Sequence, residues 1–283
     1  MSTQTSSRPV GVDELQRAWT AVSAGEFRTG PGAGKGPRGR GTAAADNWTP
    51  QAGEHTIAVI GCAGSVGAST VALAAGLAAA SPVRVIECCS VTASGLAAAS
   101  TAELGLHPTD WRQGKRDHVL LERASEVLAG VDEVPLPTEA EHETQLTILD
   151  IGWEAGQLLA TDCWLAEAVR TADQIVLVTT ATVPGMRRAS VALELLANHW
   201  QPEQITLAVR GPRRKKWPRG LEHAGGPAVR RALVADRCVE IPEDREHAVN
   251  GLDSRPVPAP LISAARQLLE PAHLSTADTS ASA

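Results

Sequence analysis

The chain has 283 residues, of which 43% are hydrophobic, and it can therefore bury a sizeable core. Its formal net charge of −6 excludes a general attraction to nucleic acid or anionic membrane, so any such contact must come from a local patch. It contains no tyrosine, which excludes mechanisms that need a phenolic hydroxyl, and its five cysteines form no C-x-x-C pair, which favours a reduced, cytoplasmic compartment.

The first 50 residues are expected to form a disordered arm, because residues 30–41 are rich in glycine, proline and basic side chains. Within this arm, residues 12–24 have the spacing of a short amphipathic helix. Its apolar face carries Val12, Leu15, Trp19 and Val22. We expect this helix to bind a partner protein or to pack on the chain's own domain, and the sequence leaves both open.

A globular domain is expected over residues 51–272, followed by a disordered tail at 273–283. Apolar, β-branched runs predict buried strands at residues 56–60, 83–89, 146–151, 174–179 and 205–209. Helical patterns lie between these runs, at residues 69–80, 161–171 and 186–199. This alternation predicts an α/β fold, a mostly parallel sheet with helices on both faces. Three further segments are a strand or a helix at 118–123, a short strand at 133–136 and a closing helix at 261–269.

The segment Ile57–Thr70 reads IAVIGCAGSVGAST and places a glycine-rich turn between a buried strand and a helix. The exposed N–H groups at the start of such a helix form an anion site, and glycine lets a phosphate approach the backbone closely. Ser69 and Thr70 add hydroxyls in the first helical turn. The segment therefore favours phosphate binding, with a tight turn that binds no ligand as the alternative.

Two kinds of ligand fit this turn. Gly61, Gly64 and Gly67 form G-x-x-G-x-x-G, a variant of the dinucleotide fingerprint, and Glu87 lies 20 residues further on, where an acid can bind a ribose hydroxyl. A short-chain dehydrogenase also needs a catalytic tyrosine, so this interpretation leaves a dinucleotide-binding regulator of the NAD type. The other interpretation is a P-loop that binds a nucleoside phosphate.

The stretch Ala63–Thr70 (AGSVGAST) resembles the phosphate loop of the MinD/ParA group of P-loop ATPases, K-G-G-x-G-K-[ST]-T, and its G-A-S-T ending is similar to the TadZ/CpaE-like branch. Leu146–Gly152 (LTILDIG) resembles the Walker B strand of the group. Val176–Arg188 and Cys238–Pro256 resemble its fourth-strand and I-P-x-D segments. The resemblance implies a P-loop NTPase-like fold, ATP or ADP with Mg²⁺ as cofactor, and a homodimer.

The resemblance also assigns roles to residues. It implies nucleotide contacts at Gly61, Gly64, Ser65, Val66, Gly67, Ala68, Ser69, Thr70, Pro242 and Asp244. It makes Ser69 and Asp150 the residues that would hold Mg²⁺, and it makes Glu87 the acid of the second strand.

Two lysines of the pattern are missing, because Ala63 stands at the signature lysine and Ala68 at the phosphate-binding lysine. Their loss removes positive charge where the transition state of phosphoryl transfer needs it. We therefore expect weak or absent hydrolysis, a pseudo-ATPase. An active ATPase with a relocated cation is the alternative, and Arg187 or Arg188 is a candidate for that cation.

The resemblance implies an assembly or positioning protein that serves DNA transfer, plasmid partition or secretion. The Ala-, Arg- and Gly-rich composition suggests a conjugative element of a high-GC bacterium. A basic segment over 210–219 indicates a contact with DNA or another anionic partner. The residues predicted to make it are Arg213, Arg214, Lys215, Lys216 and Arg219. No membrane contact is expected from the C-terminal tail, which has neither a basic residue after His273 nor an apolar face.

Overall fold

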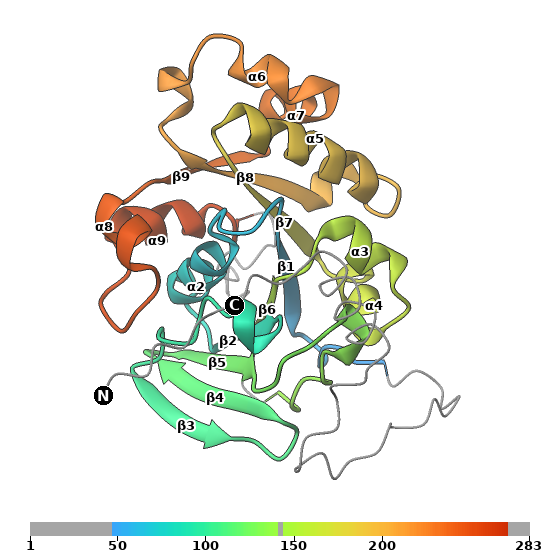
Figure 1. Ribbon diagram of the computed structural model, residues 1–283, viewed down its shortest axis with the longest axis vertical. Coiled ribbons are helices and arrows are strands. Elements are labelled where there is room, and N and C mark those ends of the chain that lie inside the picture. The colour runs from blue at the N-terminus through green and yellow to red at the C-terminus, as the bar shows by residue number, and fades with distance from the viewer. Residues whose placement is uncertain (1–46, 141–143, 271–283) are drawn as a thin grey trace, which may run out of the picture. The chain divides into compact units, whose positions relative to one another are not determined.

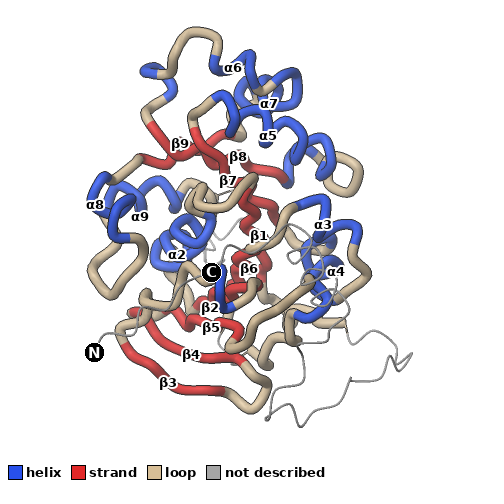
Figure 2. Tube along the Cα trace, in the orientation of Figure 1, coloured by secondary structure: helices blue, strands red, loops and turns tan. Residues whose placement is uncertain are grey.

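A computed structural model describes residues 47–140 and 144–270, so the predicted arm helix with Leu15, Trp19 and Val22 and the predicted tail lie outside the described residues. Within them a single nine-stranded sheet has the strand order β3-β4-β5-β2-β6-β1-β7-β8-β9 (Figures 1 and 2). The strands are β1 (His55–Gly61), β2 (Val83–Cys88), β3 (Ala102–Leu106), β4 (Trp111–Arg116), β5 (Val119–Ala124), β6 (Leu146–Ile151), β7 (Gln174–Thr180), β8 (Ile205–Gly211) and β9 (Cys238–Pro242).

The sheet is parallel from β5 to β9 and antiparallel at the β3–β4 and β4–β5 pairs. The five strands predicted from apolar runs are all present and adjoin one another in the parallel part, which confirms the predicted mostly parallel α/β fold. β1 pairs with β6 on one side and β7 on the other, so the glycine loop that follows β1 lies at the middle of the carboxyl edge.

Helices cover both faces of the sheet, as predicted. They are α2 (Ala68–Ala78), α3 (Ala155–Ala160), α4 (Trp164–Arg170), α5 (Val183–Leu196), α6 (Leu221–Ala224), α7 (Gly226–Val234), α8 (Arg245–Asn250) and α9 (Ala259–Arg266). Alternate side chains of β1 point to opposite faces. Ile57 and Val59 pack in a core with α2 and α9, whereas Ala58 and Ile60 pack in a second core with α3, α4, α5 and α7 (Figure 1).

Three local features differ from the prediction or complete it. Residues 118–123, which fitted a strand or a helix, lie in strand β5, and β4 forms a hairpin with it that the sequence did not predict. The short strand predicted at 133–136 is wrong: a 3-10 turn, Val131–Glu133, ends there, and Val134 and Leu136 instead accept hydrogen bonds from tryptophan side chains. Strand β8 extends two residues beyond the predicted end, to Gly211.

Trp48 precedes the predicted domain boundary at residue 51 yet packs on the domain. Its ring meets Trp164 edge to face at 6.2 Å between centroids, and the Arg84 guanidinium lies 5.7 Å from its centroid. No helix within the described residues is long and apolar enough to cross a membrane.

Candidate functional site

The glycine loop joins β1 to α2 through two residues in left-handed backbone conformation, Ser65 (φ 61°) and Gly67 (φ 95°). Gly67 is the N-cap of α2, and no side chain caps this helix start, so its first N–H groups remain available as donors. Successive N–H groups in such a turn converge on one point and form a cradle for an anion. The loop therefore has the geometry that phosphate binding requires.

The loop borders a cavity of about 680 Å³. Four other segments complete the wall: Ala93–Gly95 after β2, Asp150–Glu154 at the end of β6, Arg210 at the end of β8, and four residues between 247 and 252 in and after α8. The predicted contacts from Gly61 to Thr70 all line this cavity. It is large enough for a nucleoside polyphosphate, because ligand pockets usually span about 300–1,000 Å³.

Two carboxylates lie side by side beneath the loop. Glu87 and Asp150 are register partners in the parallel pair β2–β6, so their side chains share the face that α2 covers. Both residues are 2% exposed. The pKa of Asp150 is raised to about 8: burial is the main cause, the Glu87 carboxylate adds to it, and the hydroxyl of Ser69 opposes it. Two neighbouring acids without a full complement of cations favour protonation or a bound cation.

Asp150 fits the predicted Mg²⁺ role. Its buried Oδ2 atom has no hydrogen-bond partner among the described residues. Ser69 stands close enough for its hydroxyl to lower the pKa of Asp150. A hydroxyl and an unsatisfied carboxylate oxygen at the mouth of a phosphate loop are a donor set that suits Mg²⁺, a cation that prefers oxygen and keeps several waters.

Glu87 is committed to the fold. Its carboxylate accepts hydrogen bonds from the Ser94 hydroxyl (2.5 Å) and from the N–H groups of Gly95 (2.6 Å) and Leu96 (2.9 Å). Burial raises its pKa, and these donors together with Arg123 lower it. A carboxylate that holds the loop after β2 in this way is not presented to a ribose hydroxyl, so its placement does not favour the dinucleotide alternative.

Arg210 is a residue of the cavity that the sequence analysis assigned only to the basic segment. The strand extension to Gly211 continues the alternation from Ala208, which packs in the α2–α9 core, and so turns Arg210 toward the loop. Its Nη2 donates to the Ser65 carbonyl (3.2 Å), and its side chain crosses the Cα of Gly67. The alternation of side chains along β8 could have indicated the direction of Arg210. The strand was predicted to end at residue 209, so this indication was missed.

The alternative cations Arg187 and Arg188 lie on the exposed side of α5 and do not line the cavity. Arg188 is near enough to Cys62 to lower the pKa of that thiol, although burial dominates and raises it to about 12. The structure therefore brings Arg210 to the loop, in place of the two arginines considered from the sequence.

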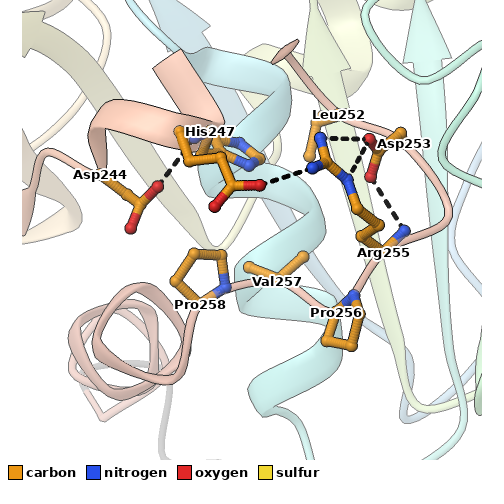
Figure 3. Close-up of a pocket in the computed structure, with 9 residues that line it drawn as sticks. Asp244, His247, Leu252, Asp253, Arg255, Pro256, Val257 and Pro258 are labelled. Atoms are coloured by element: carbon orange, nitrogen blue, oxygen red, sulfur yellow. Dashed lines mark hydrogen bonds and ion pairs between the residues drawn. The ribbon is translucent and has the colours of Figure 1, made fainter. Parts of the chain in front are cut away.

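The segment after β9 contributes other residues than those predicted. Pro242 ends β9, and Asp244 is the N-cap of α8, where its carboxylate accepts from the His247 N–H (2.7 Å). Asp244 lines a separate pocket of about 130 Å³, shown in Figure 3, where Arg255 pairs with Asp253 and Glu246. The cavity wall is instead made by four residues further along: His247, Ala248, Gly251 and Leu252.

His247 links this segment to the loop helix, because its Nε2 lies 3.3 Å from the Thr70 hydroxyl. Burial lowers the pKa of His247; Asp244 and Asp253 oppose that shift, and Arg210 and Arg116 add to it. A neutral imidazole at the wall can exchange a hydrogen bond with Thr70 or with a ligand.

The basic segment is divided between fold and surface. Arg214 pairs with Glu222 (2.8 Å) and donates to the Leu233 carbonyl (3.2 Å), and Trp217 donates to the Pro212 carbonyl (2.8 Å). The side chains left exposed are Arg213, Lys215, Lys216 and Arg219, and none has an ion pair with a described residue. These four form the basic surface that an anionic partner could contact.

No family model and no curated protein matches the chain. Several solved structures are similar to it. A ParA family ATPase from Chlorobium tepidum shares 15% identity over 78% of this chain and 99% of that chain (TM-score 0.47). MinD in the MinC:MinD complex of Aquifex aeolicus shares 17% over 76% and 96% (TM-score 0.48), and a candidate plasmid partition protein from Borrelia burgdorferi bound to AMPPNP shares 14% over 77% and 97% (TM-score 0.48).

These structures are of the ParA and MinD type, the group that the sequence motifs resemble. With identities below 25% and TM-scores below 0.5, the likeness settles neither the branch nor the role of any residue. The assignments of Asp150, Ser69 and the loop rest on the geometry of this chain.

Proposed function

We propose that this protein binds a nucleoside polyphosphate with Mg²⁺ in the cavity beside the glycine loop, hydrolyses it slowly or not at all, and acts by assembly, positioning a partner as proteins of the MinD/ParA type do. One observation carries the nucleotide site. The buried, unsatisfied Oδ2 atom of Asp150 and the Ser69 hydroxyl stand at the mouth of an uncapped helix start, on a cavity of about 680 Å³.

Each part of the site has a separate task. The N–H groups at the start of α2 would bind phosphate oxygens, and Ser69 with Asp150 would hold the cation. Mg²⁺ would neutralise charge on the phosphates. Ala68 supplies no amine to the phosphates, and removing one charged contact from such a transition state costs about 2.7–4 kcal/mol. Binding is retained because the N–H groups at the start of α2, Ser69 and Asp150 remain, whereas the missing amine lowers turnover by about 100- to 1,000-fold.

The assembly role rests on the sequence motifs and on the surfaces they leave. A homodimer, a protein partner for the predicted helix at 12–24, and DNA at the exposed basic surface are parts of this proposal. Conjugation, partition and secretion are the processes that a positioning protein of this type would serve.

The proposed site is tested by calorimetric titration of the full chain with ATP, ADP and NADH, each with and without Mg²⁺. We expect ATP and ADP to bind with an affinity that Mg²⁺ raises, and Asp150→Asn to abolish that Mg²⁺ effect. Arg170→Met, at a half-exposed ion pair outside the cavity, is the matched control that leaves it unchanged. Binding of NADH without binding of ATP would overturn the proposal in favour of a dinucleotide regulator.

The proposed slow turnover has its own measurement. Phosphate release from the parent protein should stay near background with and without DNA. Robust release that Asp150→Ala abolishes would show instead an active ATPase with a relocated cation.

A further inference from the structure

Arg210 differs in its contacts from four arginines that the fold buries or half-buries. Arg84, Arg123 and Arg214 each pair with a carboxylate, and Arg116 donates to three backbone carbonyls. The half-buried Arg210 makes, among the described residues, one side-chain hydrogen bond, to the neutral carbonyl of Ser65. A guanidinium has five N–H donors, so most of its donors lack a protein acceptor.

The position of Arg210 is fixed by the backbone around it. Its carbonyl accepts from the Ala181 N–H (2.9 Å), and Thr180 is its register partner on β7. The next residue, Gly211, has φ 144° and lies so close to Ala181 that an added Cβ would come within 2.9 Å of the Ala181 side chain. The end of β8 is therefore held tightly, and the Arg210 side chain leaves it in a defined direction, across Gly67.

The cavity needs a cation that its own loop does not supply. Ala63 and Ala68 carry no charge, and Arg210 is the one Lys or Arg among the described residues that line the cavity. The Asp150 carboxylate lines the same cavity. A planar guanidinium is well suited to two phosphate oxygens at once, which a single lysine ammonium is not.

We infer that Arg210 is the phosphate-binding cation of this site: its guanidinium, held over the loop by the Ser65 carbonyl, binds the phosphates in place of the lysine that the loop lacks at Ala68. The signature position, Ala63, still has no cation, which is consistent with the proposed slow turnover. This inference rests on the proposed nucleotide site and assigns its anion specificity to a residue outside the loop. It also predicts that the ligand must carry at least two linked phosphates, because the N–H groups at the start of α2 and the Arg210 guanidinium would bind separate groups.

The test is titration of four full-length proteins with Mg·ATP, Mg·ADP and AMP: the parent, Arg210→Ala, Arg210→Lys and the control Arg213→Ala. Arg213 is exposed, three residues further on and outside the cavity. We expect Arg210→Ala to weaken ATP and ADP by about 10- to 100-fold, as for loss of a charge-assisted hydrogen bond, with less effect on AMP. Arg210→Lys should keep part of the affinity, and Arg213→Ala should leave it within about twofold of the parent.

A rescue experiment separates charge from folding. Ala68→Lys placed in the Arg210→Ala background should restore most of the lost affinity, because the loop lysine then supplies the missing charge. Restoration cannot occur if Arg210→Ala merely distorts the loop. Parent-like ATP affinity in Arg210→Ala, or no rescue by Ala68→Lys, overturns the inference while the nucleotide site stands. Failure of the parent to bind ATP and ADP overturns the proposed function and this inference with it.

The placement of Arg210 can be checked without nucleotide. The Arg210 charge is one of the causes that lower the pKa of His247. An NMR titration of His247 should therefore show a higher pKa in Arg210→Ala than in the parent, and no change in Arg213→Ala. A His247 pKa that is lower in Arg210→Ala than in the parent would contradict this placement of the Arg210 charge.

Discussion

Buried charges lie toward both ends of the central strands, and the two groups differ in how far their carboxylates are paired with cations and hydrogen-bond donors. The amino-end cluster consists of Arg84, Glu54 and Glu122, on the face that α3 and α4 cover. The carboxyl-end pair consists of Glu87 and Asp150, beneath α2. In the first, Arg84 and several hydroxyls contact the carboxylates, and the one carboxylate oxygen without a hydrogen bond, Glu122 Oε2, still lies 3.7 Å from the Arg84 guanidinium. In the second, Asp150 Oδ2 has neither a hydrogen bond nor an ion pair with a described residue.

This difference separates a structural device from a candidate site. Arg84 lies 3.1 Å from Glu54 and 3.7 Å from Glu122, donates to Thr147 and to the Thr138 carbonyl, and is 1% exposed. Such a cluster ties the segment before β1 to β2, β5 and β6 without opening to a cavity. The carboxyl-end pair leaves one Asp150 carboxylate oxygen without a partner next to a cavity, and burial with the neighbouring Glu87 holds the pKa of Asp150 high until a cation binds. An unpaired carboxylate oxygen beside a cavity is therefore a better guide to function than a buried ion pair.

The largest expected effect concerns the amino-end cluster. Arg84→Met leaves Glu54 and Glu122 buried without their cation, and we expect the free energy of unfolding to fall by about 3–5 kcal/mol. Chemical denaturation followed by circular dichroism measures it. The matched control is Arg170→Met, at a half-exposed ion pair with Glu167 (30% and 47% of the two side chains exposed), where the loss should stay within about 1 kcal/mol. Equal losses in the two variants would contradict the distinction between the two kinds of pair.

The carboxyl-end pair should respond in the opposite direction. A carboxyl whose pKa is raised on folding, as that of Asp150 is to about 8, stabilises the fold at low pH and loses that contribution as pH rises from about 4 to about 8. Without Mg²⁺, Asp150→Asn should therefore be more stable than the parent at pH 8, by roughly 1–3 kcal/mol, and less dependent on pH. Denaturation at pH 5, 6.5 and 8 measures it.

Binding of Mg·ADP gives a second comparison between the parent and Asp150→Asn. Mg·ADP should raise the thermal midpoint of the parent and not that of Asp150→Asn, because the cation then lacks its carboxylate. A parent whose stability is flat between pH 5 and 8, or an Asn variant that Mg·ADP stabilises equally, would remove Asp150 from the site.

The smallest expected effects fall on the basic segment, where one arginine serves the fold and four cations face solvent. Arg214→Ala should cost about 1 kcal/mol through the loss of Glu222 and the Leu233 carbonyl, and Lys215→Ala should change stability by less than about 0.5 kcal/mol. For the binding of an anionic partner we expect the opposite: loss of the exposed cations should weaken binding more than loss of Arg214. If that partner is DNA, the triple variant Arg213→Ala, Lys215→Ala, Lys216→Ala should flatten the dependence of log K on log salt by roughly 0.9 per lost phosphate contact. An unchanged slope would show that the segment is only solvated.

Some of this could be predicted because it depends on local sequence. The apolar runs of β1, β2, β6, β7 and β8 are continuous since both faces of a parallel strand are buried, and a continuous run is visible in one dimension. The glycine loop could be found for the same reason, since its turn, its helix start and its hydroxyls are contiguous. Asp150 could be predicted as a site residue because it lies near the end of a buried strand.

The β3–β4 hairpin could not be predicted in this way. Its strands are short, β4 is largely polar, and β3 is mostly exposed, so no apolar run marks them. What holds the hairpin is pairing to β5 and the buried Arg116, which donates to the Ala99, Asp253 and Arg255 carbonyls. Contacts between residues this far apart leave no periodic trace in a sequence.

The sequence by itself determined the order of strands and helices along the chain, the glycine-rich turn between β1 and α2, and the absence of the two lysines from that turn. Only the tertiary structure decided which cation lies beside the loop that lacks them. Arg210 lies 145 residues from Ser65, and Glu87 reads as a ribose acid until Ser94, Gly95 and Leu96 are seen to bind it. The physical reason is that a parallel sheet brings the carboxyl ends of distant strands to one edge. Which residues are neighbours at that edge depends on strand order and register, and separation along the chain does not reveal either of these.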